Sequence, residues 1–260
     1  MPALRVAAFG DVVGEAGVRF LEKRLPSFVR ENAVDVVIVN GENACPHNGI
    51  DPDTARTLRN CGADVITSGN HVFRQNSIRD FLDESPYLIR PANYPDCVPG
   101  MGYTTVSTPQ GRLLVINVLG CVYMEAMASP FDTVDAILKK SEGKYDLAVL
   151  DVHAEATSEK AALARYFDGR LDAVFGTHTH VQTSDARILT KKTGFITDLG
   201  MCGPKDSVLG VEPATVIEKF RTKLPVRFRF ATGKSVLEGA LLTLASGVGC
   251  TEIKSFRIDE

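Results

Sequence analysis

The feature that most constrains the fold is an alternation of short β-branched runs with longer amphipathic stretches over the first two thirds of the chain. This alternation is typical of βαβ units, in which helices join parallel strands and cover the sheet. Strands are expected at Arg5–Phe9, Asp35–Val39, Asp64–Thr67, Leu113–Val118, Asp146–Val152 and Asp172–Phe175. The apolar spacing predicts helices at Val18–Glu31, Asp51–Asn60, Ser77–Glu84, Asp132–Glu142 and Ser158–Asp168. Pro26 is expected to kink or interrupt the first helix.

From Ala186 onward the pattern changes to strands separated by hairpin-like breaks, with one helix at Ala214–Lys223. The strands are expected at Arg187–Thr190, Gly194–Thr197, Val226–Phe230, Ser235–Leu244 and Glu252–Ile258. This change predicts a second sheet packed on the first. No repeat, low-complexity tract or linker divides the 260 residues, so we expect a single domain over residues 1–260.

Composition excludes several classes of protein. Hydrophobic residues make up 44% and charged residues 23%, close to the average for globular proteins. The net charge of -3, without blocks of Lys and Arg, argues against long nucleic acid as a partner. No signal peptide or membrane-spanning apolar stretch is recognisable, which predicts a cytoplasmic protein without a membrane partner. The six cysteines are widely spaced and are expected to be free thiols.

Polar residues follow five of the expected strands at the point where each strand ends. These residues are Asp11; Glu42 and Asn43; Asn70 and His71; His153; and His178 and His180. In open α/β sheets, ligands bind outside the carboxyl ends of the strands, where the connecting loops converge. The five clusters are therefore expected to surround one site, and they hold four of the five histidines in the chain.

The residue types in these clusters favour a metal site. Three imidazoles, two carboxylates and two side-chain amides can together bind two ions such as iron or manganese. Each residue also has a simpler interpretation, because Asp11 could cap a helix, Asn43 and Asn70 could form turns, and His153 could be a hydrogen-bonded histidine. Five such coincidences at successive strand ends are improbable, so the metal site is the preferred hypothesis.

In order, the motifs GDVVG, NGEN, SGNH, DVHAE and GTHTH resemble those of the calcineurin-like metallophosphoesterase superfamily. The similarity is closer to its YmdB-type branch, through GDVVG, NGEN, the HAEATSEK segment that begins at His153, and DLGMCGP. Together with the strand pattern, this resemblance implies an α/β fold in which two packed mixed β-sheets are flanked by helices, an α/β/β/α sandwich.

Two positions depart from the broader superfamily. Val13 stands where a histidine ligand is usual, and Asn43 is the natural substitute. Glu42 replaces an aspartate, and its longer side chain can still bridge two ions. The resemblance implies a first metal held by Asp11, Glu42, Asn43 and His180, and a second held by Glu42, Asn70, His153 and His178.

The expected reaction is hydrolysis by a hydroxide that bridges the two metals, since such a pair, about 3.5–4 Å apart, can clamp the attacking and leaving oxygens of a phosphoryl group. The chain has no GxSxG, Walker A or GxGxxG motif that would indicate another chemistry. His71 follows Asn70 directly and should overhang the phosphate, as a candidate general acid for the leaving oxygen. A histidine that only orients the loop is the alternative.

The resemblance implies a phosphodiesterase acting on 2′,3′-cyclic nucleotides, whereas the residues themselves indicate only a small phosphodiester substrate. A regulatory protein that binds metal and nucleotide without turnover is the competing hypothesis. A metallo-β-lactamase-like hydrolase is disfavoured because the chain has no HxHxDH run. The sequence does not fix the oligomeric state, and a homo-oligomer is compatible with it.

Overall fold

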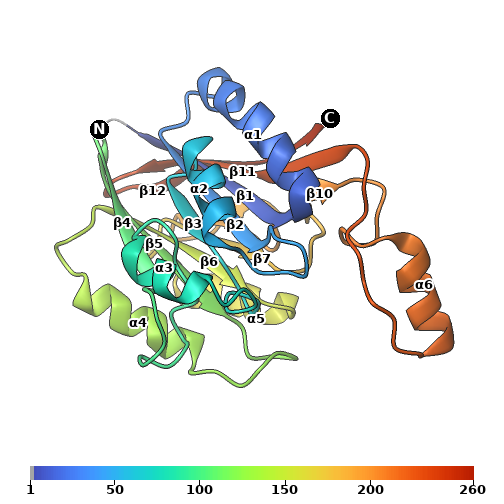
Figure 1. Ribbon diagram of the computed structural model, residues 1–260. Helices are drawn as coiled ribbons and strands as arrows, with labels where there is room; N and C mark the ends of the chain where they lie inside the picture. The colour runs from blue at the N-terminus through green and yellow to red at the C-terminus, as the bar shows by residue number, and fades with distance from the viewer. Residues whose placement is uncertain (1–2) are drawn as a thin grey trace.

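The computed structural model describes residues 3–260 as two six-stranded sheets packed face to face, with helices on their outer faces (Figure 1). The first sheet has the order β12-β11-β10-β1-β2-β3. Its strands are β1 (Leu4–Val13), β2 (Val36–Asn43), β3 (Val65–Thr67), β10 (Met201–Pro204), β11 (Ser235–Ala245) and β12 (Gly249–Asp259). Strands β1, β2 and β3 are parallel, whereas β11 runs antiparallel to β1, so the sheet is mixed.

The second sheet has the order β4-β5-β6-β7-β9-β8 and is also mixed, with β4 antiparallel to β5 and β5, β6 and β7 parallel. Its strands are β4 (Tyr103–Thr108), β5 (Gly111–Leu119), β6 (Leu147–His153), β7 (Ala173–Thr177), β8 (Arg187–Ile188) and β9 (Gly194–Ile196). The expected α/β fold class, with two packed mixed sheets flanked by helices, is confirmed.

Helices cover the outer faces of both sheets, and one further helix stands away from them. They are α1 (Gly14–Glu31), α2 (Pro52–Asn60), α3 (Ile78–Glu84), α4 (Pro130–Lys140), α5 (Thr157–Tyr166) and α6 (Pro213–Thr222). Helices α1 and α2 pack against strands of the first sheet, and α4 and α5 pack against strands of the second. Within residues 3–260, no helix is both long enough and apolar enough to cross a membrane.

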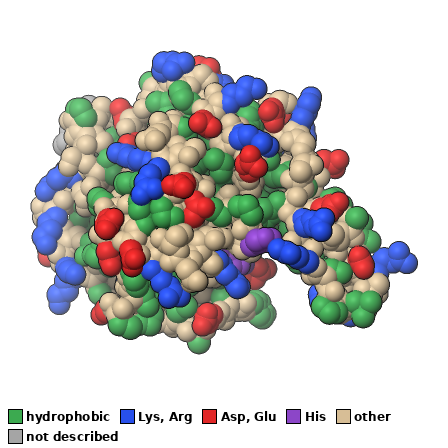
Figure 2. All heavy atoms as spheres, in the orientation of Figure 1, with side chains coloured by type: hydrophobic (Ala, Val, Ile, Leu, Met, Phe, Trp, Pro, Cys, Tyr) green, Lys and Arg blue, Asp and Glu red, His purple; other side chains and the backbone are tan. Residues whose placement is uncertain are grey.

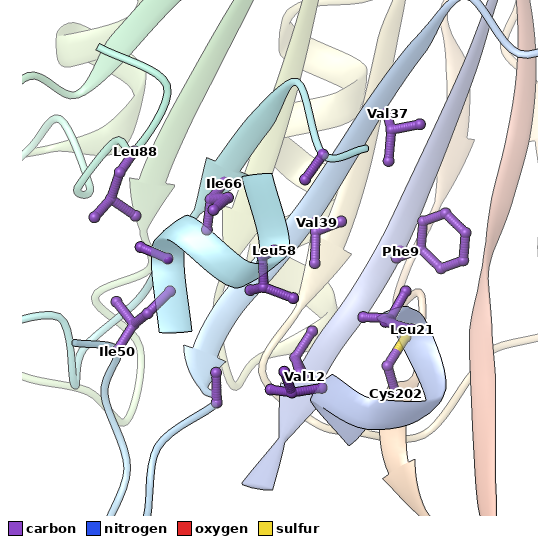
Figure 3. Close-up of a cluster of buried hydrophobic side chains, with 14 of the residues drawn as sticks. Phe9, Val12, Leu21, Val37, Val39, Ile50, Leu58, Ile66, Leu88 and Cys202 are labelled. Carbon is purple, nitrogen blue, oxygen red and sulfur yellow. The ribbon is translucent and has the colours of Figure 1, made fainter. Parts of the chain in front are cut away.

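Alternation of side chains along β1 explains how the first sheet is buried on both faces. Ala7 and Phe9 belong to the apolar cluster shared with α1 and α2, which Figure 3 shows around Phe9 and Leu21. Val6 and Ala8 point the other way and belong to the cluster between the two sheets. Because successive side chains of a strand face opposite sides, a strand covered on both faces must be apolar throughout.

Strand β5 of the second sheet repeats this arrangement. Leu113 and Val115 join the cluster between the sheets, whereas Leu114 and Ile116 join a third cluster beneath α4 and α5. The core therefore consists of three apolar layers, and the middle layer joins the two sheets.

The structure corrects the expected grouping of the strands. The six predicted parallel strands divide equally between the two sheets, and the C-terminal strands do not form a sheet of their own. Strands β8 and β9 complete the second sheet, whereas β10, β11 and β12 complete the first. Hydrophobic alternation reports which faces of a strand are buried and carries no information on its neighbours, which explains the error.

Other expectations were wrong locally. The predicted strand Val226–Phe230 does not form, and only Phe230 makes an isolated bridge, to Val211. Strands β4 and β10 were not predicted. Helix α1 continues through Pro26 to Glu31, so Pro26 does not interrupt it, and a kink there stays a prediction. Helix α6 stands away from the sheets on two connecting segments, and we call residues 205–231 the α6 arm (Figure 1).

The packing of α1 on β10 makes a stability test. A Cβ atom added to Gly17 of α1 would overlap the backbone carbonyl oxygen of Cys202 in β10. Gly17→Ala should lower the free energy of unfolding by roughly 1–2 kcal/mol, because overpacking costs about 1–3 kcal/mol and alanine gains at most about 1 kcal/mol in a helix. Thermal unfolding followed by circular dichroism measures the change. A higher melting temperature would show that helix propensity outweighs the contact.

Candidate functional site

The predicted site residues all lie at the carboxyl ends of parallel strands, and these strands belong to both sheets. Asp11 is in β1, Glu42 and Asn43 end β2, Asn70 and His71 follow β3, His153 ends β6, and His178 and His180 follow β7. Because β1, β2 and β3 belong to the first sheet and β6 and β7 to the second, the site lies across the junction of the two sheets. The structure therefore brings together every residue that the sequence predicted.

The two carboxylates lie among the imidazoles. Asp11 Oδ1 is 3.8 Å from His153 Nδ1 and 3.7 Å from His180 Nε2. Glu42 Oε1 is 3.7 Å from His153 Nε2. The backbone N–H of His178 donates to the other oxygen of Asp11, at 3.0 Å. The β1, β2, β6 and β7 strand ends thus meet within a few ångströms.

The side-chain amides complete the cluster. Asn70 Oδ1 lies 3.2 Å from His153 Nε2, and His178 Nδ1 lies 3.1 Å from the same nitrogen. Asn43 Nδ2 lies 3.1 Å from His180 Nε2. All seven expected ligands therefore belong to one connected set of contacts.

Of the residues that the structure describes, the two buried carboxylates lack groups that would compensate their negative charge. Asp11 and Glu42 are 0% and 1% exposed, and Asp11 Oδ1 and Glu42 Oε2 have no hydrogen-bond partner among residues 3–260. Burial, followed by the negative charge of Asp198, raises the pKa of Asp11 well above its usual value, and burial also raises the pKa of Glu42. Buried acceptors without donors are costly, so the site needs a compensating positive charge.

Hydrogen bonding fixes the ring nitrogens that face these carboxylates. Thr177 donates its hydroxyl hydrogen to Asp151 at 2.8 Å, so its oxygen accepts from His153 Nδ1 at 2.9 Å. His180 Nδ1 donates to the Leu209 carbonyl at 2.9 Å. The Nε2 lone pairs of His153 and His180 therefore face the site, and burial lowers the pKa of both imidazoles, which keeps them neutral.

These features match the chemistry of a metal site, because neutral imidazoles and orphaned carboxylate oxygens are cation ligands. Within residues 3–260, however, no group of three or more His, Cys, Asp or Glu side chains converges closely enough to enclose an ion. The imidazoles and amides instead make hydrogen bonds with one another, as in the His153–His178 and Asn43–His180 pairs. The residues fit a metal by chemistry, and the ligand assignment stays a prediction.

Asp151 supports the site and was not predicted to do so. Its carboxylate is fully buried and accepts from Thr67 Oγ1 at 2.6 Å, Asn40 Nδ2 at 3.1 Å and Thr177 Oγ1 at 2.8 Å. Burial raises its pKa to about 6. Asp151 lies two residues before His153 on β6, so both side chains lie on the same face, and this spacing is the sequence signal that could have found it.

Val13, which occupies the position of a usual histidine ligand, faces an apolar cluster with Met201, Val236 and Phe230. Its side chain also fills the space beside Gly210, where an added Cβ would overlap it. A histidine at this position would displace that packing. Asn43, the predicted substitute, instead contacts His180 directly.

A buried ion pair anchors the turn that carries His178 and His180. Lys160 Nζ lies 2.7 Å from Asp198 Oδ2, and both side chains are essentially inaccessible to solvent. The same Asp198 oxygen accepts from the backbone N–H of Thr179, which lies between the two histidines. Both histidines have left-handed backbones, with φ of 97° and 61°, which is unfavourable for residues other than glycine. The ion pair therefore helps to hold a strained turn.

Comparison with known proteins agrees with this architecture. A family model described as "YmdB-like protein" matches residues 8–256. The chain is 43% identical to a 2′,3′-cyclic-nucleotide 2′-phosphodiesterase of Bacillus subtilis over 93% of this chain and 91% of the relative. A structure described as a novel phosphatase of Mycoplasma pneumoniae superposes with a TM-score of 0.94 and 30% identity, covering 100% of this chain and 95% of that one. A hypothetical protein of Thermus thermophilus gives a TM-score of 0.93 and 40% identity, with 99% and 100% coverage.

The fold is that of metallophosphoesterase-like phosphatases. Within this class, the chain belongs to the YmdB-like family, as its motifs predicted.

The buried ion pair provides a second stability test. Lys160→Met should cost about 3–5 kcal/mol of unfolding free energy, because it leaves the Asp198 carboxylate buried without its charged partner. Lys205→Met is the matched control, since the Lys205–Asp259 pair is half exposed and should contribute less than about 1 kcal/mol. Chemical denaturation measures both variants. Equal losses would show that the buried pair is not an anchor.

Proposed function

We propose that this protein is a dinuclear metal-dependent phosphodiesterase whose substrates are small phosphodiesters of the 2′,3′-cyclic nucleotide class. The Bacillus subtilis relative and the Mycoplasma pneumoniae structure support phosphodiesterase or phosphatase activity as the general function. The observation that carries the proposal is that two buried carboxylates, each with one oxygen that lacks a hydrogen-bond partner among residues 3–260, lie 3.7 Å from imidazole Nε2 atoms: Asp11 from His180, and Glu42 from His153.

The proposed ligands divide into two sets that share one carboxylate. The first set is Asp11, Glu42, Asn43 and His180, and the second is Glu42, Asn70, His153 and His178. Iron and manganese are the expected metals, since both accept mixed oxygen and imidazole ligands. When bound, such ions supply charge stabilisation for the phosphoryl oxygens and a water that is acidic enough to act as the nucleophile.

The proposed role of His71 is to transfer a proton to the leaving oxygen. Its Nδ1 lies 3.0 Å from Glu42 Oε1 and 3.1 Å from Asn43 Oδ1, and both of these oxygens are acceptors, so Nδ1 carries hydrogen. The opposite nitrogen, Nε2, lies 3.5 Å from the Asn48 amide nitrogen, and the side chain is 20% exposed. Nε2 is therefore the atom that can hold or deliver a proton towards bound substrate.

The bridging role of Glu42 is open to direct test. Glu42→Gln keeps the size of the side chain and removes its charge, so it should lower the metal content from two ions per chain and reduce turnover about 100-fold or more, since two-metal chemistry depends on both ions. Glu238→Gln is a control, because Glu238 is also buried but pairs with Arg257. Elemental analysis of purified protein gives the result. Two retained ions in Glu42→Gln would overturn the bridging assignment.

His71→Ala should separate catalysis from metal binding. The variant should keep both ions and slow turnover by about 10²–10⁴-fold, the usual contribution of a positioned acid. The loss should be larger for adenosine 2′,3′-cyclic phosphate than for bis-p-nitrophenyl phosphate, because an alkoxide needs a proton more than an aryl oxide does. Metal analysis and steady-state rates with both substrates measure the effect.

Two results would count against these assignments. Equal slowing of both substrates by His71→Ala, or loss of metal, would make His71 a loop-orienting residue or a ligand. Tight nucleotide binding by the wild-type protein without turnover of either substrate would favour the hypothesis of a regulatory protein over that of an enzyme.

A further inference from the structure

A cleft of about 400 Å³ opens beside the candidate site, and its lining includes neither His71 nor any of the expected metal ligands. It lies between the first residues of α1, the loop of residues 45–49 and residues 228–232 of the polypeptide that returns from the α6 arm. We propose that this cleft binds the nucleobase of the substrate, an inference that rests on the proposed function. Three features support this proposal: the position of the cleft, the side chains that line it, and the contacts that hold its two walls together.

The cleft lies on the side of the site where the leaving group is expected. Asn48 lines the cleft, and its amide nitrogen is 3.5 Å from His71 Nε2, the atom assigned to the leaving oxygen. In a 2′,3′-cyclic nucleotide, the leaving oxygen belongs to the ribose that carries the base. The base must therefore lie within one sugar of His71, on the side away from the attacking water, and the cleft begins at that point.

The lining suits a flat aromatic ring. Phe228 and Phe230 line the cleft, and Phe228 is 46% exposed, so its ring is open to contact with a ligand. Arg19 and Arg229 add guanidinium groups, and planar cations stack on bases as aromatic rings do. Asn48 contributes an amide that can both donate and accept hydrogen bonds. Stacking surfaces with a few polar groups are what a nucleobase requires.

Contacts distant in the sequence hold the two walls together. Arg227 Nη2 lies 3.0 Å from His47 Nε2, although the residues are 180 positions apart. His47 and Asn48 both have left-handed backbones, with φ of 70° and 69°. Such conformations are unfavourable for histidine and persist where surrounding contacts impose them. Figure 2 shows histidine and basic side chains together where the α6 arm meets the body of the molecule.

A larger cavity, of about 660 Å³, is a weaker candidate for the base. It lies between α4 and residues 90–103, and includes Tyr103 and Met127 in its lining. Within residues 3–260, none of the residues that line it makes a side-chain hydrogen bond to His71 or to an expected metal ligand. The smaller cleft is in contact with His71 through Asn48, which makes it the preferred site.

The test compares substrates with and without a base in the full-length protein. Phe228→Ala should raise KM for adenosine 2′,3′-cyclic phosphate about tenfold, the usual size for loss of one stacked base contact, and leave kcat unchanged. It should not change KM for methyl ribofuranoside 2′,3′-cyclic phosphate, which lacks the base. Phe220→Ala is the matched control, because Phe220 is an exposed phenylalanine on α6 outside the cleft. An unchanged KM for the adenosine substrate, or equal rises for both substrates, would overturn the proposal.

A binding measurement separates this proposal from the proposed function. Calorimetric titration of adenosine 3′-phosphate should give tighter binding to wild type and Phe220→Ala than to Phe228→Ala, by the same factor of about ten. If binding depends on Phe228 but the protein turns over neither cyclic phosphate, the proposed phosphodiesterase activity is rejected and the proposed base-binding cleft is retained. If turnover occurs and does not change in Phe228→Ala, the phosphodiesterase activity is retained and the base-binding cleft is rejected. Absence of both binding and turnover would reject both.

Discussion

Two buried carboxylates, Asp11 and Glu42, impose the main constraint on this structure. In the described part of the chain, each has an oxygen without a hydrogen-bond partner, in a place from which solvent is excluded. Burying such a group costs several kcal/mol unless a charge or donors compensate it. The nearest imidazoles do not donate to these oxygens, since His153 and His180 have committed their Nδ1 hydrogens to Thr177 and Leu209. What the site lacks is therefore positive charge, which is why its chemistry points to metal ions.

The polar network around the site maintains this lack of positive charge. Asp151 takes the hydroxyl hydrogen of Thr177, which obliges Thr177 to accept from His153 Nδ1 and turns the unprotonated Nε2 of that imidazole towards the site. Lys160 neutralises Asp198 beside the turn of His178 and His180. Buried polar groups that are fully satisfied hold their neighbours in one arrangement. The supporting residues are satisfied, whereas the carboxylates of the site are not.

The sequence predicted much of the site because each site residue follows an apolar run. A buried parallel strand must be apolar on both faces, so a polar cluster such as Gly41-Glu42-Asn43 marks the strand end clearly. The partition of strands between sheets was not predictable, since β1 and β5 are buried on both faces in the same way. The Lys160–Asp198 pair depends on contacts between residues far apart in the chain. Val226–Phe230 alternates apolar and basic residues like a strand, yet among residues 3–260 it has no neighbouring strand to pair with, and only Phe230 makes an isolated bridge.

The apolar layer between the sheets then determines the geometry of the site. Asp11 and Glu42 are carried by the first sheet, and His153 and the His178 turn by the second, so their distances depend on how the sheets pack. Ala8 and Ile38 of the first sheet meet this layer from one side, and Val149 and Phe175 of the second meet it from the other. Close-packed interiors resist changes of even one methylene group, and this resistance fixes the separation of the sheets. The relative positions of the site residues, which no single loop could define, are thus set by a core that contains none of them.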